Sequence, residues 1–218
     1  MVRVVGWVKE KMMPSSAFNA FVESYFGDPY MAWHDGLDEG SLAALEGEER
    51  KEAEKMLLDA LGSGDYRPAA GLRVLRSTES VAKLKEQLGD ATGRGAVEIA
   101  LALWEIAEWP PAVNVMIDEL KHGAHWGSQI DAANALGKVK GGPEVVEALL
   151  GALDDEEGLV RSNAADSLID LLGLRVKKNN YGGYDIAIDV MSEDEVERKK
   201  AVDRLRGLAE RKMGKGKE

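Results

Sequence analysis

The chain contains no cysteine and only three histidines among its 218 residues. Without cysteine there can be no disulfide, no thiolate metal site and no cysteine nucleophile. No apolar run is long enough for a signal peptide or a membrane span, so we expect a cytoplasmic protein without membrane contact. The sequence also lacks a Walker loop, a Gly-x-Gly-x-x-Gly motif, a Gly-x-Ser-x-Gly elbow and a His-Glu-x-x-His motif. These absences favour a protein that is not an enzyme and uses no cofactor.

The composition is that of a soluble, folded and helical protein. Hydrophobic residues make up 44% of the chain and charged residues 31%, and alanine, leucine and glutamate are abundant. The formal net charge is −11, with 6 basic and 12 acidic residues in 1–62, 10 and 18 in 63–173, and 12 and 9 in 174–218. Because an acidic body repels phosphate backbones, we do not expect nucleic acid as a partner.

Three stretches of the chain resemble one another at a fixed spacing. Residues 100–120 superpose on 133–153 at an offset of 33, and residues 164–172 begin a further copy at an offset of 32. A degraded first copy ends with Val81, Leu84 and Leu88. Self-similarity at a fixed period indicates stacked supersecondary units, none of which buries its apolar face alone.

Each unit is predicted to be a helix, a tight turn and a second helix. One unit has helices over 96–108 and 111–122, separated by Trp109-Pro110-Pro111, and the next has helices over 128–140 and 144–153. Small residues recur at one place in the first helix, where they allow neighbouring helices to approach closely. These residues are Ala100, Ala132, Ala133, Ala164 and Ala165.

Helical caps are expected at both ends of one continuous stack. Residues 1–62 form the N-terminal cap, with a helix that starts after a serine cap at position 15 or 16, a turn over 27–36 and a long helix over 48–61. Residues 63–173 form the repeats. Residues 174–218 contain a basic loop over 175–184, a short helix over 185–191 that packs on 160–172, and a last helix from Glu193 with a Ser192–Glu195 capping box.

The segment 154–173 (DDEEGLVRSNAADSLIDLLG) resembles the short bacterial HEAT repeat, also called the phycobilin-lyase-type HEAT-like repeat. In that family an acidic turn precedes a Val-Arg pair, a small-residue pair, a leucine and a closing glycine. The matching residues here are Val160, Arg161, Ala164, Ala165, Leu168 and Gly173. The resemblance implies an all-α fold, an α-solenoid of HEAT-like helix pairs, over roughly half of the chain.

One acidic stripe follows from the repeat register. In stacks of this type the second helices are expected to line the concave face, and the core positions leave several polar residues on their solvent side. These are Glu79, Glu86, Asn114, Asp118, Glu144 and Glu147. We also consider Trp109, in the turn between two helices, as an interface anchor. The alternatives are that the stripe only solvates the stack and that Trp109 packs within it.

The function predicted from these features is protein binding without catalysis. We expect a basic protein partner on an acidic concave face, with the chain as an immunity protein or inhibitor of a basic toxin domain, or as an adaptor. Small molecules and metals are not expected, because His122 and His125 lie in a turn without a third nearby ligand. Two alternatives stay open: a bilin lyase or isomerase, by resemblance to the namesake of the repeat, and a HEAT-like DNA-binding or glycosylase protein.

Overall fold

The N-terminal cap begins where the sequence predicted its first helix. The computed structural model describes residues 13–62, 64–139, 142–174 and 182–214. The Ser15 side chain accepts a hydrogen bond from the Phe18 amide and caps α1 (Ser16–Phe26). The cap continues with α2 (Pro29–Asp35), α3 (Glu39–Ala43) and α4 (Gly47–Ala60). Gly71 of the following helix leaves room for Leu57 of α4, whose Cδ2 lies 2.7 Å from where a Cβ would be.

The predicted turn over 27–36 is wrong in part. Residues 29–35 form α2, because the Asp28 carboxylate accepts a hydrogen bond from the Tyr30 amide and Pro29 occupies the first turn. Both signals are present in the sequence. Two glycines nearby suggested a turn, but only Gly36, with a φ of 81°, ends the helix.

The repeat region consists of paired helices, as predicted. In the described part of the chain there are helices and no strands, so the all-α solenoid is confirmed. The first helices of the pairs are α5 (Arg67–Leu75), α7 (Gly93–Ala107), α9 (Trp126–Lys138) and α11 (Gly158–Leu171). Their partners are α6 (Val81–Leu88), α8 (Pro111–His122), α10 (Pro143–Gly151) and α12 (Gly182–Asp189), with 3₁₀ turns η1 (Thr78–Ser80) and η2 (Ala152–Asp154).

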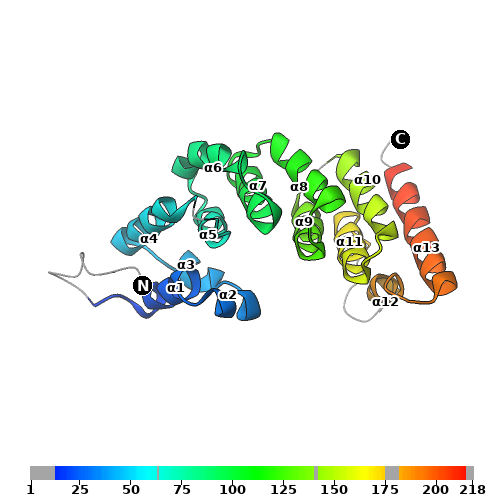
Figure 1. Cartoon of the computed structure of the whole chain (residues 1–218), viewed down its shortest axis with the longest axis horizontal. Helices are drawn as coiled ribbons and strands as arrows, with labels where there is room; N and C mark the ends of the chain where they lie inside the picture. Colours follow the sequence, from blue (N-terminus) through cyan, green and yellow to red (C-terminus); the bar gives the residue numbers. More distant parts are fainter. Residues whose placement is uncertain (1–12, 63, 140–141, 175–181, 215–218) are drawn as a thin grey trace.

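The pairs stack into a curved array with two rows of helices (Figure 1). The first helices α5, α7, α9 and α11 form the inner row, and α6, α8 and α10 form the outer row. Along the inner row each helix packs closely on the next, whereas successive outer helices contact one another less. The expectation that the second helices line the concave face is therefore wrong.

Close packing between the first helices explains this direction of curvature. The alanines at the interfaces of the first helices are buried, including Ala100, Ala132 and Ala164. Gly137 of α9 faces Ser167 of α11 so closely that a Cβ would lie 2.8 Å from the Ser167 Cβ. The outer helices present larger core residues, such as Met116 and Leu149. Buried alanines also occur on the outer helices, at Ala112 and Ala148. The bend toward the first helices therefore follows from their closer mutual packing, to which contacts such as Gly137–Ser167 contribute.

The repeat motif in α11 has a distinct physical role at each position. Val160, Ala164, Ala165 and Leu168 are buried, and Gly173 ends the helix with a φ of 62°. The buried guanidinium of Arg161 donates hydrogen bonds to the carbonyls of Asp155, Glu156 and Val190, at 2.7, 3.0 and 2.7 Å. Arg161 therefore ties the acidic turn before α11 to the end of α12.

The C-terminal helices differ in detail from the prediction. Helix α12 packs on α11 as expected, and residues 175–181 of the predicted basic loop lie outside the described residues. Residues 182–184 belong to α12 rather than to that loop. The last helix, α13 (Glu195–Gly214), is capped by Asp194, whose carboxylate accepts hydrogen bonds from the amides of Val196 and Glu197. The predicted Ser192 cap is therefore wrong, because Asp194 takes that place.

Candidate functional site: an acidic stripe on the outer helices

The residues predicted to bind a partner lie on the elements expected from the repeat, but on the outer row. Glu79 is in η1, Glu86 in α6, Asn114 and Asp118 in α8, and Glu144 and Glu147 in α10. All six side chains are exposed. We call the five carboxylates of this set the acidic stripe. The sequence analysis placed this stripe on the concave face. That prediction is wrong, because α6, α8 and α10 form the outer row in Figure 1.

The carboxylates of the acidic stripe are free of ion pairs with the described residues. Within that part of the chain, Glu79, Glu86, Asp118 and Glu147 make no salt bridge or side-chain hydrogen bond. Glu144 accepts one hydrogen bond from the Gly142 amide at 3.2 Å, next to the start of its own helix. Negative charge on the stripe is thus available to a molecule that approaches from solvent.

Trp109 is only half-buried and lies beside the stripe. Its ring packs against the hydrophobic core, and the Lys85 ammonium lies 5.0 Å from the ring centroid. A cation over an indole face is attracted by the ring quadrupole. Trp109 is therefore held by contacts within the chain, with part of its surface still accessible.

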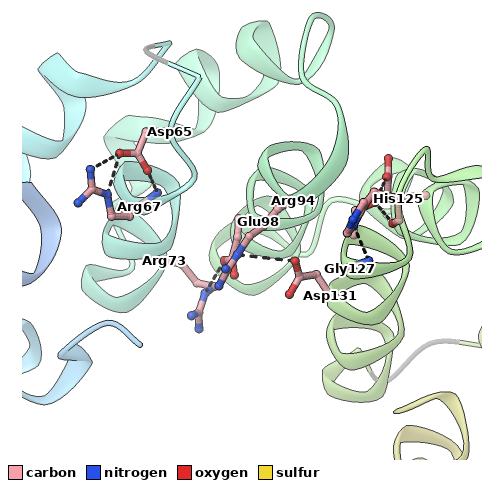
Figure 2. Close-up of polar contacts among 10 residues, drawn as sticks. Asp65, Arg67, Arg73, Arg94, Glu98, His125, Gly127 and Asp131 are labelled. Carbon is pink, nitrogen blue, oxygen red and sulfur yellow. Dashed lines mark hydrogen bonds and ion pairs between the residues drawn. The ribbon is translucent and has the colours of Figure 1, made fainter. Parts of the chain in front are cut away.

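The inner row carries a charge network that the sequence analysis did not identify. The Arg73 guanidinium of α5 lies 2.6 Å from a Glu39 carboxylate oxygen of α3, and 3.8 and 3.6 Å from oxygens of Glu98 and Glu105 on α7. Next to it, Arg94 lies 3.7 Å from Asp131 of α9 (Figure 2). The network therefore links the N-terminal cap to three successive first helices.

Burial is the main influence on the ionisation of this network. Loss of solvent raises the pKa of the Glu98 carboxyl, and Arg73, Arg94 and Lys138 oppose that shift. Burial also raises the pKa of Asp131, against the attraction of Arg94. The Arg94 guanidinium lies 3.7 Å from the centroid of the Tyr66 ring, which covers it on one side. The carboxylates of the network are therefore engaged by cations of the same chain.

A signal for the inner network is present in the repeat register. Arg73, Glu105, Lys138 and Asp170 are spaced by 32 or 33 residues, so they occupy one position on successive first helices. Their charges alternate in sign along the stack. Because the sequence analysis assigned the functional surface to the second helices, it did not compare charges at matching positions of the first helices.

His122 and His125 take separate structural positions. His122 is the last residue of α8, and the His125 ring nitrogen accepts a hydrogen bond from the Gly127 amide at 2.9 Å, capping α9 (Figure 2). Among the residues described, no group of three or more His, Cys, Asp or Glu side chains could hold a metal ion. None of the helices described is long and apolar enough to span a membrane.

Comparison with known proteins agrees with the geometry of the stack. Residues 81–169, from α6 into α11, match the family of HEAT repeats. No curated protein and no solved structure matches the chain. The match covers the helix pairs that carry most of the acidic stripe and the middle of the inner row. The segment 81–169 is therefore similar to HEAT repeats.

Proposed function

We propose that this chain is a protein-binding module that takes a basic protein partner on the acidic stripe. HEAT repeats generally mediate interactions between proteins. One observation supports this choice of surface. Four carboxylates of the stripe are exposed and make no ion pair with the described residues: Glu79, Glu86, Asp118 and Glu147. We place the interaction on the outer row, where these carboxylates lie, and we propose no catalytic step.

The contrast between the two rows supports the outer one. On the inner row each of the four carboxylates of the charge network lies beside a guanidinium group, Arg73 or Arg94, and is partly compensated within the chain. On the outer row Lys85 is directed to the Trp109 ring. A surface with uncompensated charge of one sign attracts a partner of the other sign over several ångströms, which raises the association rate.

Charge and fold together support a more specific role within this class. We propose an immunity or inhibitor protein, or an adaptor, that works in the cytoplasm and whose partner has a basic binding surface. An acidic inhibitor of a basic toxin domain that acts on nucleic acid would occupy the site that otherwise attracts phosphate groups. The likeness of 154–173 to the short bacterial, phycobilin-lyase-type repeat supports a bacterial setting and carries no argument for bilin chemistry.

Charge reversal on α10 tests the surface. The immobilised chain is used to capture proteins from extracts of its host, and captured basic proteins are then titrated individually against Glu144→Lys/Glu147→Lys. The control, Glu23→Lys/Glu46→Lys, makes the same change in net charge on exposed residues of α1 and next to the start of α4, away from α10. We expect the α10 variant alone to lose at least about tenfold in affinity. Equal losses in both variants, or none, would remove the stripe from the proposal.

Co-expression tests the role. If the captured partner is a toxin, the wild-type chain should protect cells that produce it and the α10 variant should protect them less. A captured partner that is not toxic would favour the adaptor role over the immunity role.

A further inference from the structure

A second surface lies where the first helices begin, on the part of the stack from α9 to α13. Trp126 is the first residue of α9 and Leu159 the second of α11, and both side chains are exposed, by 45% and 40%. Met191 follows α12 and Val196 is the second residue of α13, with 37% and 62% exposed. We call Trp126, Leu159, Met191 and Val196 the apolar row.

Contacts between neighbouring elements connect the positions of the apolar row. Gln129, one turn into α9, donates to an Asp155 carboxylate oxygen at 3.5 Å, in the turn that leads to α11. A Cβ on Gly158 would lie 3.9 Å from the Met191 Cα, so the start of α11 touches the end of the α12 segment. Arg198 of α13 donates to the Ser192 carbonyl at 2.9 Å. The row therefore runs across three successive helix starts.

Free carboxylates surround the apolar row. Glu156, Asp189, Glu193 and Glu195 are exposed and, within the described residues, make no ion pair or side-chain hydrogen bond. Three of them line a surface depression of about 690 Å³ between α13 and the turn before α11. Of the cations that line this depression, Arg161 and Arg198 bond to backbone carbonyls, Arg206 pairs with Asp154, and Lys199 is exposed. Carboxylates still outnumber cations in its lining. Apolar surface framed by unpaired negative charge is complementary to an apolar face framed by positive charge.

We propose that the apolar row binds a basic amphipathic helix of the protein partner. Neighbouring packed helices are about 8–10 Å apart, and residues i and i+7 of a helix are about 10.5 Å apart along its axis. A partner helix with an apolar residue at every seventh position thus places successive side chains over Trp126, Leu159 and the Met191–Val196 pair. Lysines or arginines on the flanks of that helix reach Glu156, Glu193 and Glu195. The inference rests on the proposed protein-binding function but uses a surface separate from the acidic stripe.

Two synthetic peptides of equal composition provide the test. One 18-residue Leu/Lys peptide has leucines at i, i+3, i+4, i+7, i+11 and i+14, and the other has the same residues in an order without an apolar face. Binding is measured by fluorescence anisotropy at about physiological salt, where nonspecific charge attraction is reduced. We expect the amphipathic peptide to bind at least about tenfold more tightly than the scrambled peptide. Equal affinities would mean that charge alone drives binding and would overturn the proposal.

Variants of the row locate the binding. Trp126→Ser/Leu159→Ser should weaken the amphipathic peptide at least about tenfold, since large apolar anchors dominate interface energies, and Val196→Ser tests the third helix start separately. Circular dichroism and urea unfolding confirm that these variants are folded, as expected for exposed positions. An undiminished affinity in both variants would overturn the proposal.

Other occupants and the proposed function are distinguished by two further measurements. If a second copy of the chain covers the row, gel filtration shows an oligomer that Trp126→Ser/Leu159→Ser dissociates and the peptide does not bind, which overturns the helix as occupant. Glu144→Lys/Glu147→Lys should leave peptide affinity within about twofold, because neither residue belongs to the apolar row or lines the depression beside it, and salt screens the remaining charge interactions. If that variant loses the natural partner while the row variants retain it, the acidic stripe stands and the apolar row fails.

Discussion

The guanidinium of Arg161 donates its Nε hydrogen to the carbonyl of Val190 at 2.7 Å, and so joins the start of α11 to the end of the α12 segment. The same side chain holds the carbonyls of Asp155 and Glu156 in the turn before its own helix. One buried side chain thus satisfies backbone acceptors on two sides of a repeat boundary. Arg198 repeats part of this arrangement one helix later, with a bond to the Ser192 carbonyl.

Replacing Arg161 should destabilise the C-terminal part of the stack. In Arg161→Met the carbonyls of Asp155, Glu156 and Val190 lose a charged donor, so we expect a cost of at least about 2 kcal/mol in the free energy of unfolding. Arg198→Met removes a single bond from a half-buried side chain and should cost less than half as much. Urea unfolding of both variants measures the difference; similar costs would show that the boundary does not depend on Arg161.

Replacing each of two glycines with alanine should have opposite effects on stability. Gly137 lies in the close contact between α9 and α11, whereas Gly151 of α10 has open space around it. Gly137→Ala would place a Cβ 2.8 Å from the Ser167 Cβ and 3.2 Å from its Cα, so we expect a loss of about 1–3 kcal/mol. Gly151→Ala adds a Cβ with no atom within 4 Å at a helical φ of −63°, and should stabilise the chain by about 0.5–1 kcal/mol. Thermal and urea unfolding report both, and a neutral Gly137→Ala would argue against the tight inner row.

The raised pKa of Glu98 predicts a pH dependence of stability. In the folded state Glu98 keeps its proton above the ordinary value of 4.5, because burial disfavours its ionised form. Between 4.5 and the raised pKa the folded chain binds more protons than the unfolded chain, so the contribution of Glu98 to stability falls as the pH rises through this window. Asp131 contributes in the same direction from its ordinary value of 3.8.

The variant Glu98→Gln isolates that contribution. Glutamine cannot titrate, so the fall in urea midpoint between about pH 4.5 and neutral should be shallower than in the wild type. Glu86→Gln makes the same substitution on an exposed residue of the acidic stripe and is measured alongside as the matched control. Asp38 and Glu49, whose pKa values are lowered by hydrogen bonds from Ser41 and Ser15, act oppositely, and their contribution is lost as the pH falls through those lowered values. Identical curves for Glu98→Gln and the wild type would refute the assignment.

Salt should slow the association of a basic partner with the acidic stripe. Raising ionic strength from about 0.05 to 0.5 M shortens the screening length from roughly 14 to 4 Å. We expect the association rate of a basic partner to fall steeply over this range while its dissociation rate changes little. Stopped-flow mixing measures both rates, with Glu144→Lys/Glu147→Lys as the variant whose salt dependence should be weaker. A salt-independent association rate in the wild type would exclude electrostatic steering.

Much of the fold could be predicted from repetition alone. The repeat spacing of 32 or 33 residues and the helical periodicity of the apolar positions predict helix pairs. Helix α8 occurs at the residues predicted, Pro111–His122. Other boundaries shift by two or three residues, as for α9, which begins at Trp126 rather than Ser128 because the His125 side chain caps it. The domain limits proposed from composition stay a prediction.

The direction of curvature was not predicted correctly from the sequence. The sequence analysis identified the recurring alanines of the first helices and inferred close approach, but it assigned the concave face by resemblance to other stacks. In this chain Ala132, Ala164 and the Gly137–Ser167 contact shorten the inner spacing, so the first helices line the concave side. The exposure of Glu144 and Glu147 was predictable from the helical periodicity. Which row of helices lines the concave face was not, because it depends on how closely the helices of each row pack.

Looser contact between α8 and α10 than between α9 and α11 has a mechanical consequence. A small change in the angle between successive units moves the outer helices apart or together, while the tightly packed first helices act as the hinge line. The separation of Asp118 from Glu147 therefore varies with the bend of the whole superhelix. A ligand that bridges these two carboxylates would select one bend, and its affinity would report on any force that straightens the chain.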